Sequence, residues 1–474
     1  MPDKRIELVP LGQRRFEARA YPLASFLLKL MRAALILAVL LLASPLVEAQ
    51  SEIPGILSMR ERAEIQDAWL VERLETVVPD LMRRESIDLW IISAREYNED
   101  PVIETMLPAT WHAARRRTTL VFYDDGSAVE RLAVARYDVG PFPRAWTPEE
   151  QPDQWARLAE IIVERNPQRI GVNRSSTFAL ADGLTGTEYD ALMEALPADL
   201  QDRVVSAEML AVGWLETRTA SEMATYPTIL RIARGIIHEG LSEAAITPGV
   251  TTTDDLAWWY RDRIRQLGLV TWFHPGVDVQ RADAPAAGDD FSGRPDANVI
   301  QPGDLVWVDF GISYLGLQTD TQQLAYVLRP GETEAPNGLV AGMAAANRVQ
   351  DLLTSSFATG RSGNEILKMA LDASATEGLN ATIYTHPIGF HGHAAGPTIG
   401  LWDQQGGVPG RGDYPLYPNT AHSIELNARM DVPEWGGKSV RFSLEEDAFF
   451  DGESVWYIDP RQEALLLIPR QGGQ

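Results

Sequence analysis

Two aspartates eleven residues apart, in the stretch DLVWVDFGISYLGLQTDTQQLAYVL at 304–328, constrain this chain more than any other feature. The stretch predicts two strands, at 304–312 and 317–328, joined by a tight turn. Asp309 lies inside an apolar strand, where a carboxylate is costly unless it is paired or bound to metal, and Asp320 lies at a similar depth on the returning strand. Two carboxylates that a hairpin brings together repel unless they share a proton or a cation. An aspartate hydrogen-bonded at each turn is the alternative.

The residue types that the chain offers narrow the chemistry of any metal site. The chain has no cysteine, which excludes disulfides, thiolate catalysis and cysteine-bound zinc. A metal ion would be held by His, Asp and Glu, a donor set that suits Zn, Mn, Co or Fe. The net charge of −24 argues against a nucleic-acid partner, because the phosphates would be repelled. It favours neutral or cationic ligands or metal ions, and solubility alone is the plain alternative.

The first fifty residues have the pattern of a targeting segment. From Met31 the sequence MRAALILAVLLLASPLVEAQS places one Arg before an apolar run and ends in a small-x-small cleavage site at Ala49. We interpret 1–50 as a leader with a secretory signal peptide whose true start is Met31, and we expect a periplasmic or secreted protein. The apolar run is too short for a comfortable membrane span, so no stable span is expected after cleavage. A retained amino-terminal anchor is the alternative.

The rest of the chain divides into two predicted domains. Residues 51–212 alternate predicted helices and strands, among them a helix at 57–84 and strands in IDLWIIS, TTLVFYDDG and ERLAVARY, which indicates an α/β domain. Residues 213–474 begin with a long amphipathic helix that Ser221 can cap, and continue with a second helix, then strands and two further helices. The first of these domains contains no cluster of catalytic residue types.

Three of the seven histidines lie in one glycine-rich stretch, HPIGFHGHAAG at 386–396. In a strand, His391 and His393 would face the same side and could present two imidazoles to one site. Two acids follow in apolar, strand-like surroundings, Glu425 in HSIELN and Glu445 in VRFSLEEDAFF. Each of these signals is weak singly, and the information lies in their order and their shared strand setting.

That order, two Asp eleven residues apart and then His, Glu and Glu, resembles the pita-bread metallohydrolases, which include methionine aminopeptidase, Xaa-Pro aminopeptidase, prolidase and creatinase. QPGDLVWVDFG resembles the family's strand with the first Asp, and ITPGVTTTDDLAWWYRDRIRQLG resembles its early helical segment. The likeness covers nearly all of 55–470. It implies a creatinase-like α/β amino-terminal domain over 51–212 and an α+β pita-bread catalytic domain over 213–474, commonly assembled as a homo-oligomer.

Position by position, the resemblance implies a metal site. The family has a small residue before its metal-binding His and a Gly three residues after it, a form that fits His393 better than His391. The family's second His, which helps to hold the substrate, would then be His391 or His386. The implied metal ligands are Asp309, Asp320, His393, Glu425 and Glu445.

The sequence also departs from the family. Glu425 is followed by Leu426-Asn427 where the family usually has Pro-Gly. After Asp320 the sequence has Thr321-Gln322-Gln323, where the peptidases often have an Arg. A further family His, seven residues after the metal-binding one, falls on Gly400 if His393 is the ligand. The set of metal ligands is therefore complete, while the residues that handle the substrate are altered.

The resemblance implies a metal-dependent peptidase of the Xaa-Pro aminopeptidase or prolidase type, with small peptides as substrates. Two divalent ions, Mn, Co or Zn, would bridge a water molecule and lower its pKa, and so supply hydroxide near neutral pH. Glu425 would carry a proton to the leaving nitrogen, and His391 or His386 would donate a hydrogen bond to the developing oxyanion. A creatinase-like metal-free C–N hydrolase and a non-catalytic binding protein of the same fold are the alternatives.

Overall fold

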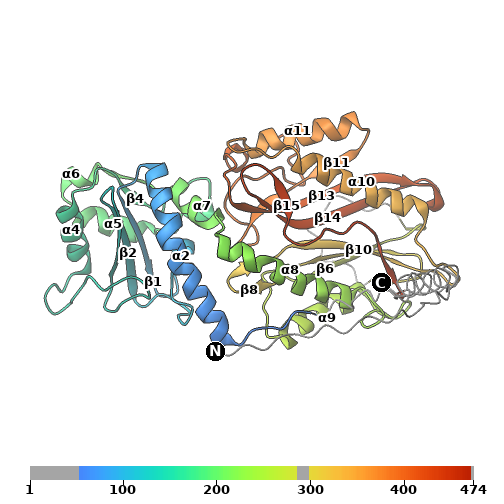
Figure 1. Ribbon diagram of the computed structural model, residues 1–474, viewed down its shortest axis with the longest axis horizontal. Helices are drawn as coiled ribbons and strands as arrows, with labels where there is room; N and C mark the ends of the chain where they lie inside the picture. Colours follow the sequence, from blue (N-terminus) through green and yellow to red (C-terminus); the bar gives the residue numbers. More distant parts are fainter. Residues whose placement is uncertain (1–52, 285–297, 471–474) are drawn as a thin grey trace, which may run out of the picture. The chain divides into compact units, whose positions relative to one another are not determined.

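The computed structural model describes residues 53–284 and 298–470. The leader predicted at 1–50 lies outside the described residues. Two larger β-sheets, one of five strands and one of nine, form the frame of the described chain (Figure 1). No helix among the described residues is long and apolar enough to cross a membrane. The division into domains at residue 212 remains a prediction.

The five-stranded sheet has the order β3-β2-β1-β4-β5. The pairs β1–β2 and β2–β3 are antiparallel, and the pairs β1–β4 and β4–β5 are parallel. The strands predicted in IDLWIIS, TTLVFYDDG and ERLAVARY correspond to β1, β2 and β3. The bounds are β1 Leu89–Arg95, β2 Arg117–Asp124, β3 Val129–Val134, β4 Ile170–Val172 and β5 Val204–Ser206.

Helices cover both faces of this sheet, because alternate residues of β1 point to opposite sides. Trp90 and Ile92 pack with α2 and α7, whereas Leu89 and Ile91 pack with α4 and α5. The helix predicted at 57–84 is α2. The helices of this region are α2 Met59–Glu85, α3 Pro101–Glu104, α4 Gln154–Arg165, α5 Gly186–Ala195, α6 Ala198–Gln201 and α7 Glu208–Glu216.

The nine-stranded sheet is centred on one long antiparallel hairpin, β13–β14. The main order is β11-β13-β14-β10-β7-β6, and β12, β15 and β16 pair with β13, β14 and β10. The bounds are β6 Gly276–Gln280, β7 Leu305–Phe310, β10 Thr321–Val327, β11 Asn380–Ile383, β12 His386–Ile388, β13 Thr420–Val432, β14 Lys438–Phe450, β15 Val455–Tyr457 and β16 Leu466–Ile468.

Two pairs of helices pack against this sheet, and its strands lie between the two pairs (Figure 1). On β7, Val306, Val308 and Phe310 pack with α8 and α9, and on β13, Ile424 and Leu426 pack with α10 and α11. The alternate residues of both strands therefore face away from the helices, which leaves that face for polar side chains. The helices are α8 Ala220–Gly240, α9 Thr253–Gln266, α10 Asn337–Thr354 and α11 Gly363–Thr376.

The hairpin predicted at 304–328 forms, but its strands are shorter than expected. Between β7 and β10 the chain makes a small second hairpin, β8 Ser313–Tyr314 and β9 Leu317–Gln318. Leu315 and Gly316 at its tip have φ of 56° and 79°, because a two-residue turn that matches the twist of the strands needs positive φ at both positions. Asp320 consequently lies in the connection between β9 and β10 rather than inside a strand.

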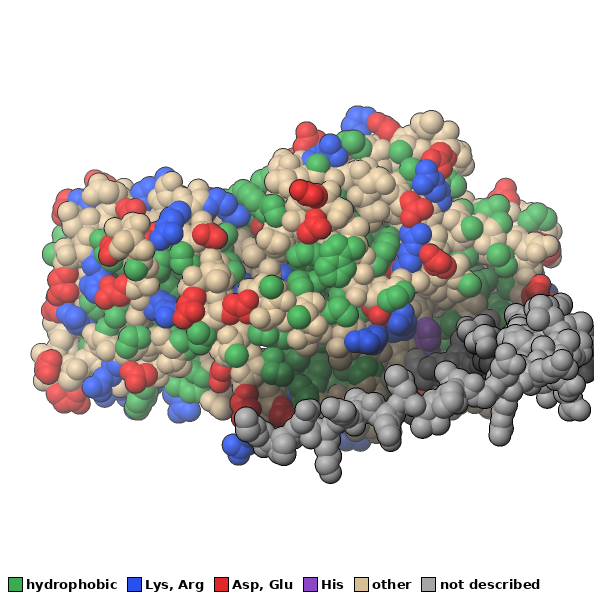
Figure 2. All heavy atoms as spheres, in the orientation of Figure 1, with side chains coloured by type: hydrophobic (Ala, Val, Ile, Leu, Met, Phe, Trp, Pro, Cys, Tyr) green, Lys and Arg blue, Asp and Glu red, His purple; other side chains and the backbone are tan. Residues whose placement is uncertain are grey.

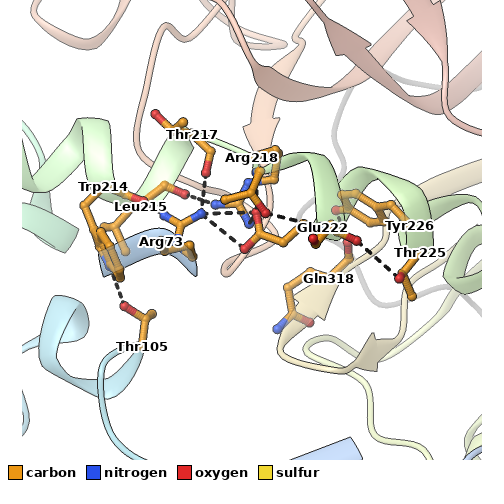
Figure 3. Close-up of polar contacts among 12 residues, drawn as sticks. Arg73, Thr105, Trp214, Leu215, Thr217, Arg218, Glu222, Thr225, Tyr226 and Gln318 are labelled. Carbon is orange, nitrogen blue, oxygen red and sulfur yellow. Dashed lines mark hydrogen bonds and ion pairs between the residues drawn. The ribbon is translucent and has the colours of Figure 1, made fainter. Parts of the chain in front are cut away.

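A buried group of charges joins α2 to α8. Thr219, not Ser221, caps α8: its hydroxyl accepts from the backbone N–H of Glu222, and the Glu222 carboxylate accepts from the backbone N–H of Thr219 at 2.8 Å. Glu222 also pairs with Arg73 of α2 at 3.1 Å and with Arg218 at 3.6 Å (Figure 3). All three charged side chains are buried. We call Arg73, Arg218 and Glu222 the Arg–Glu cluster.

The two guanidinium groups of this cluster have further partners. Both flank the ring of Phe390, at 4.7 Å from Arg73 and 4.5 Å from Arg218. Burial lowers the pKa of Arg73 to about 10, against the opposing effect of Glu222, so the group is charged at neutral pH. The guanidinium groups also donate to backbone carbonyls around the end of α7, those of Trp214, Leu215 and Thr217 (Figure 3).

Candidate metal centre

Four polar side chains form one row across four neighbouring strands of the nine-stranded sheet. Gln322 of β10 is paired with Asp309 of β7 on one side and with Glu445 of β14 on the other. Glu445 is in turn paired with Glu425 of β13. Residues directly opposite each other in antiparallel strands have their side chains on the same face. The register therefore brings three carboxylates that are far apart in the sequence into one site.

His386 and Asp320 complete this site. β12 pairs with β13 so that His386 lies opposite Ser423, which shares a face of β13 with Glu425. The His386 Nδ1 atom lies 3.0 Å from the carbonyl oxygen of Pro387, which can only accept, so Nδ1 is the donor and Nε2 is the nitrogen that faces the acids. The nearest carboxylate oxygens to Nε2 are those of Asp320 at 3.6 Å, Glu425 at 3.9 Å and Glu445 at 3.5 Å. We call Asp309, Asp320, His386, Glu425 and Glu445 the carboxylate cluster.

The carboxylate cluster has no cation of its own within the described chain, since its acids form no ion pair with Lys or Arg there. Asp320 and Glu445 are only 3% and 1% exposed. One oxygen each of Asp309 and Asp320, and Nε2 of His386, are buried without a hydrogen-bond partner among the described residues. Burial, and next the charge of Glu445, raise the pKa values of Asp309, Asp320 and Glu425 well above their ordinary values.

Such a site fits divalent ions, because a cation would satisfy the unpaired oxygens and relieve their repulsion. Carboxylate oxygens with an imidazole nitrogen, and no sulfur, suit ions such as Mn, Co or Zn. Two of the sets of closely spaced donors share Glu445, the arrangement that a pair of neighbouring ions would need. The three sets, each with donor atoms within 4.8 Å of one another, are Asp309, Asp320 and Glu445; His386, Glu425 and Glu445; and Asp320, His386 and His393.

The structure thus brings all five sequence-predicted ligands to one place, and it adds His386. It does not bring His391 there. β12 ends at Ile388 and the glycine-rich stretch that follows is a series of bends, so the alternation expected for His391 and His393 in a strand is wrong. His391 lies near Arg218, and burial, with the charge of Arg218, lowers its pKa to about 4. Its role toward substrate stays a prediction.

His393 lies at the border of the carboxylate cluster and is more exposed than His386. Its ring centre is 4.6 Å from that of His386 and 5.2 Å from that of Trp272. A Cβ atom on Gly392 would come within 2.2 Å of the Trp272 indole, so only glycine allows this approach. Burial is the largest of the effects that lower the pKa of His393 to about 4. The imidazole is therefore neutral at pH 7 and can donate a hydrogen bond.

Gln322 is a residue of the site that the sequence revealed only as a departure from a family. Its Nε2 donates to Glu425 at 2.5 Å and to Glu445 at 2.9 Å, and its Oε1 accepts from the indole N–H of Trp307 at 2.9 Å. The hydroxyl of Ser423 also donates to Glu445, at 2.6 Å. A Gln in a buried strand indicates a polar site, because its amide needs hydrogen-bond partners. Which partners it has depends on the register between β10 and β14, and no local sequence pattern predicts that register.

Comparisons with known proteins agree with this geometry. Residues 228–445 match the model of metallopeptidase family M24. No curated protein matches the chain in sequence. Three solved structures are similar in fold: X-Pro aminopeptidase from Thermotoga maritima MSB8 (TM-score 0.58, 15% identity, 82% of this chain and 99% of that one), Xaa-Pro dipeptidase from Bacillus anthracis (0.55, 17%, 86% and 100%) and prolidase from Pyrococcus horikoshii OT3 (0.52, 13%, 86% and 100%).

The family match includes β7, β10, β12 and β13 and reaches Glu445 of β14, so it contains every residue of the carboxylate cluster. The solved structures cover more than four fifths of this chain, and at identities this low they establish the fold. The solved structures agree with the predicted α/β amino-terminal part followed by a pita-bread part. Residues 228–445 therefore match metallopeptidase family M24, and the fold of the chain is that of the pita-bread metallopeptidases.

Proposed function

We propose that this protein is a periplasmic or secreted peptidase of the Xaa-Pro aminopeptidase or prolidase type that uses two divalent ions. The carboxylate cluster carries the proposal, because its buried acids have no counter-ion from the described chain. Similarity in fold to an X-Pro aminopeptidase, an Xaa-Pro dipeptidase and a prolidase supports cleavage next to proline. The leader pattern supports export, and the predicted homo-oligomer is part of the same proposal.

In this proposal the four acids of the carboxylate cluster supply the oxygen donors, and His386 rather than His393 supplies the nitrogen. The Nε2 atom of His386 supports this exchange, because it lies 3.5–3.9 Å from three of the carboxylates and has no hydrogen-bond partner among the described residues. The family spacing supports it too. Seven residues after His386 lies His393, whereas seven residues after His393 lies Gly400.

Divalent ions held by these residues would activate water and polarise the scissile carbonyl. Gln322 and Ser423 hold the Glu445 carboxylate in one orientation through their hydrogen bonds. Glu425, whose side chain is 15% exposed, moves the proton from water to the leaving nitrogen. His393, neutral at pH 7 and accessible, donates a hydrogen bond to the oxygen of the scissile carbonyl.

Elemental analysis and peptide hydrolysis test the proposal together. The purified protein is dialysed against Mn, Co or Zn, its metal content is measured, and Xaa-Pro dipeptides and Xaa-Pro-Xaa tripeptides are assayed beside the same peptides with Ala in place of Pro. We expect metal binding and turnover of the proline peptides, and the preferred length separates a dipeptidase from an aminopeptidase. Turnover without metal would favour the creatinase-like alternative. Metal binding without turnover of any peptide would favour a binding protein.

Three matched histidine variants test the assignment within the site. His386→Ala is expected to lower metal content, His393→Ala to keep the metal and lower the rate, and His391→Ala to keep the metal as well. Loss of metal in His393→Ala with full metal in His386→Ala would return the ligand role to His393.

A further inference from the structure

A pocket of about 450 Å³ lies at one edge of the five-stranded sheet, outside the M24 region. The pocket lies at the ends of three strands: β1 and β3 finish there and β2 starts there. These strand ends bring Arg95, Arg117 and Arg136 to the pocket. The segment before β2 adds Arg115 and Arg116. We call this cavity the arginine pocket. Its lining also includes Glu96, Trp111, Tyr137 and Trp146.

Two of these arginines share a single carboxylate. Arg95 and Arg117 are direct partners in the β1–β2 pair, and like charges in that position are destabilising without an anion between them. Glu188 of α5 supplies it: its oxygens lie 2.6 Å from Arg117 Nε and 3.4 Å from Arg95 Nε, and its side chain is 2% exposed. One buried carboxylate therefore serves two guanidinium groups, and neither is neutralised fully.

The other three arginines, Arg115, Arg116 and Arg136, form no ion pair with any described carboxylate. Two of them are held by aromatic rings, a contact that orients a guanidinium group without neutralising it. The rings are Trp111, 4.8 Å from Arg115, and Trp146, 5.5 Å from Arg136. Arg116 has φ of 55°, which is uncommon for a residue with a side chain, and its backbone N–H donates to Glu96 at 3.2 Å.

The charge balance indicates which kind of ligand the pocket suits. The pocket has five arginines and two nearby carboxylates, those of Glu96 in the lining and Glu188 behind it. Its formal charge is therefore +3, in a chain whose net charge is −24. On the face that Figure 2 shows, acidic and basic side chains are instead interspersed. Guanidinium groups bind carboxylates and phosphates through paired N–H donors. A ligand with two or three negative charges would balance this site.

We propose that the arginine pocket binds a small molecule that carries two or three carboxylate or phosphate groups. Its volume falls within the range of small-molecule sites, and the tryptophan rings give it apolar walls beside the charged groups. We propose this ligand in addition to the peptide substrate, because no residue that lines the pocket belongs to the carboxylate cluster.

Calorimetric titration of the full chain tests this proposal. Pyrophosphate and tricarballylate, a tricarboxylate, are titrated separately at low ionic strength into protein freed of divalent ions with EDTA, so that the metal centre holds no ion to attract an anion. At least one probe is expected to bind, and more weakly as salt is added, because salt screens the charges. Binding of pyrophosphate alone assigns a phosphate ligand, and binding of tricarballylate alone assigns a carboxylate ligand.

The decisive comparison is between two sets of variants. The triple variant Arg115→Gln, Arg116→Gln and Arg136→Gln removes only guanidinium groups without ion pairs, and it should weaken binding at least about tenfold. Arg174→Gln is the matched control. Arg174 lies 4.1 Å from the ring of Tyr189 in a cavity of about 470 Å³ whose lining also includes Asp182 and Glu208, and this variant should bind as wild type does.

Two results would overturn the proposal: neither probe binds the wild-type chain, or the triple variant binds as tightly as wild type. Self-association of the wild-type chain that the triple variant lacks, measured by sedimentation velocity, would assign the pocket to a contact between copies and would also overturn it. Circular dichroism checks that the triple variant is folded. If it is not, the exposed Arg136→Gln alone is expected to weaken binding, and an unchanged affinity there would count against the pocket.

Discussion

The Arg–Glu cluster and the carboxylate cluster are both buried groups of charges, but the described chain supplies counter-ions only to the first. In the first, Glu222 faces two guanidinium groups, and these have backbone carbonyls and an aromatic ring as further partners. In the second, four acids face one another and an imidazole nitrogen. A buried charge is tolerated when it is paired. Where the chain supplies the counter-ions, the buried charges are paired within the fold. Where it does not, a bound cation would have to pair them.

The two clusters are also physically connected. Phe390, flanked by Arg73 and Arg218, belongs to the bends between β12 and His393. Tyr226 of α8 donates to the backbone carbonyl of Gln318 (Figure 3). The side-chain amide of Gln318 in turn donates to the carbonyl of Phe390 at 3.3 Å. The Arg–Glu cluster thus holds the segment that carries His393 to the border of the metal centre.

Removal of Arg73 should give the largest change in stability. Arg73→Met leaves Glu222 buried without its closest partner, and breaking a buried pair in this way costs about 3–5 kcal/mol in the free energy of unfolding. Urea unfolding followed by circular dichroism measures it. Because Arg73 donates nothing to the carboxylate cluster, metal content per folded chain should not change.

The double variant Arg73→Met with Glu222→Gln is the control for this effect. It removes the uncompensated charge, so it should recover part of the lost stability. A double variant no more stable than Arg73→Met would show that lost packing of the arginine, and not the unpaired carboxylate, explains the effect.

Removal of one predicted metal ligand should act on function rather than on the fold. Asp309→Asn keeps the size of the side chain but weakens its hold on a cation, so metal content and peptidase rate should fall together. Loss of a residue that only orients a metal ligand lowers metal affinity or activity about 10–100-fold. Loss of the ligand itself is expected to lower them at least about 100-fold. Elemental analysis and initial rates on an Xaa-Pro peptide measure the two effects. A rate equal to wild type would remove Asp309 from the metal centre.

Much of this comparison could be predicted from the sequence, because the signals are local. An acid within a run of apolar residues marked Asp309, Glu425 and Glu445, and the spacing to Asp320 pointed to a hairpin. Helix α2 and strands β1, β2 and β3 were likewise predicted from apolar periodicity and turn residues. The one misplaced cap, Ser221 instead of Thr219, is an error of two residues.

The parts that could not be predicted depend on contacts between distant segments. Whether His386 or His393 faces the carboxylates depends on the point where β12 leaves β13, at Ile388. The partners of Gln322 depend on a single paired position between β10 and β14. The pairing of Arg73 with Glu222 joins residues 149 apart, and a buried arginine in an amphipathic helix looks like a surface residue until its partner is known.

Gln322 offers a smaller test of how the metal centre is held together. Gln322→Met removes the amide that donates to Glu425 and Glu445 while nearly keeping the volume, so we expect metal affinity to fall about 10–100-fold. Titration of Mn into metal-free protein measures the affinity without reference to activity. Gln323→Met, at the neighbouring buried position that faces the other side of β10, is the matched control and should leave metal affinity unchanged.

Replacing one carboxylate of each cluster by its amide tests the contrast most directly. The resulting change in the free energy of unfolding should have opposite signs in the two clusters. The pKa of Asp320 is raised in the folded protein, chiefly by burial and next by Glu445, so the folded state binds the proton more tightly than the unfolded state. The metal-free wild-type protein should therefore lose stability as pH rises above the ordinary aspartate value of 3.8, by up to about 1.4 kcal/mol per pH unit for one proton. Asp320→Asn has no proton to lose there. It should be more stable than wild type without metal at pH 7, and the difference should shrink toward pH 4.

Glu222→Gln should change stability in the opposite direction at pH 7, since it removes the partner of two buried guanidinium groups. Added Mn should reverse the order of wild type and Asp320→Asn, because binding to the folded state alone stabilises the wild-type protein by mass action. Urea unfolding at pH 5, 6 and 7, with and without Mn, measures all three comparisons. If Asp320→Asn were the less stable protein at every pH without metal, the acids would have a partner within the chain, and the two clusters would be the same kind of structure.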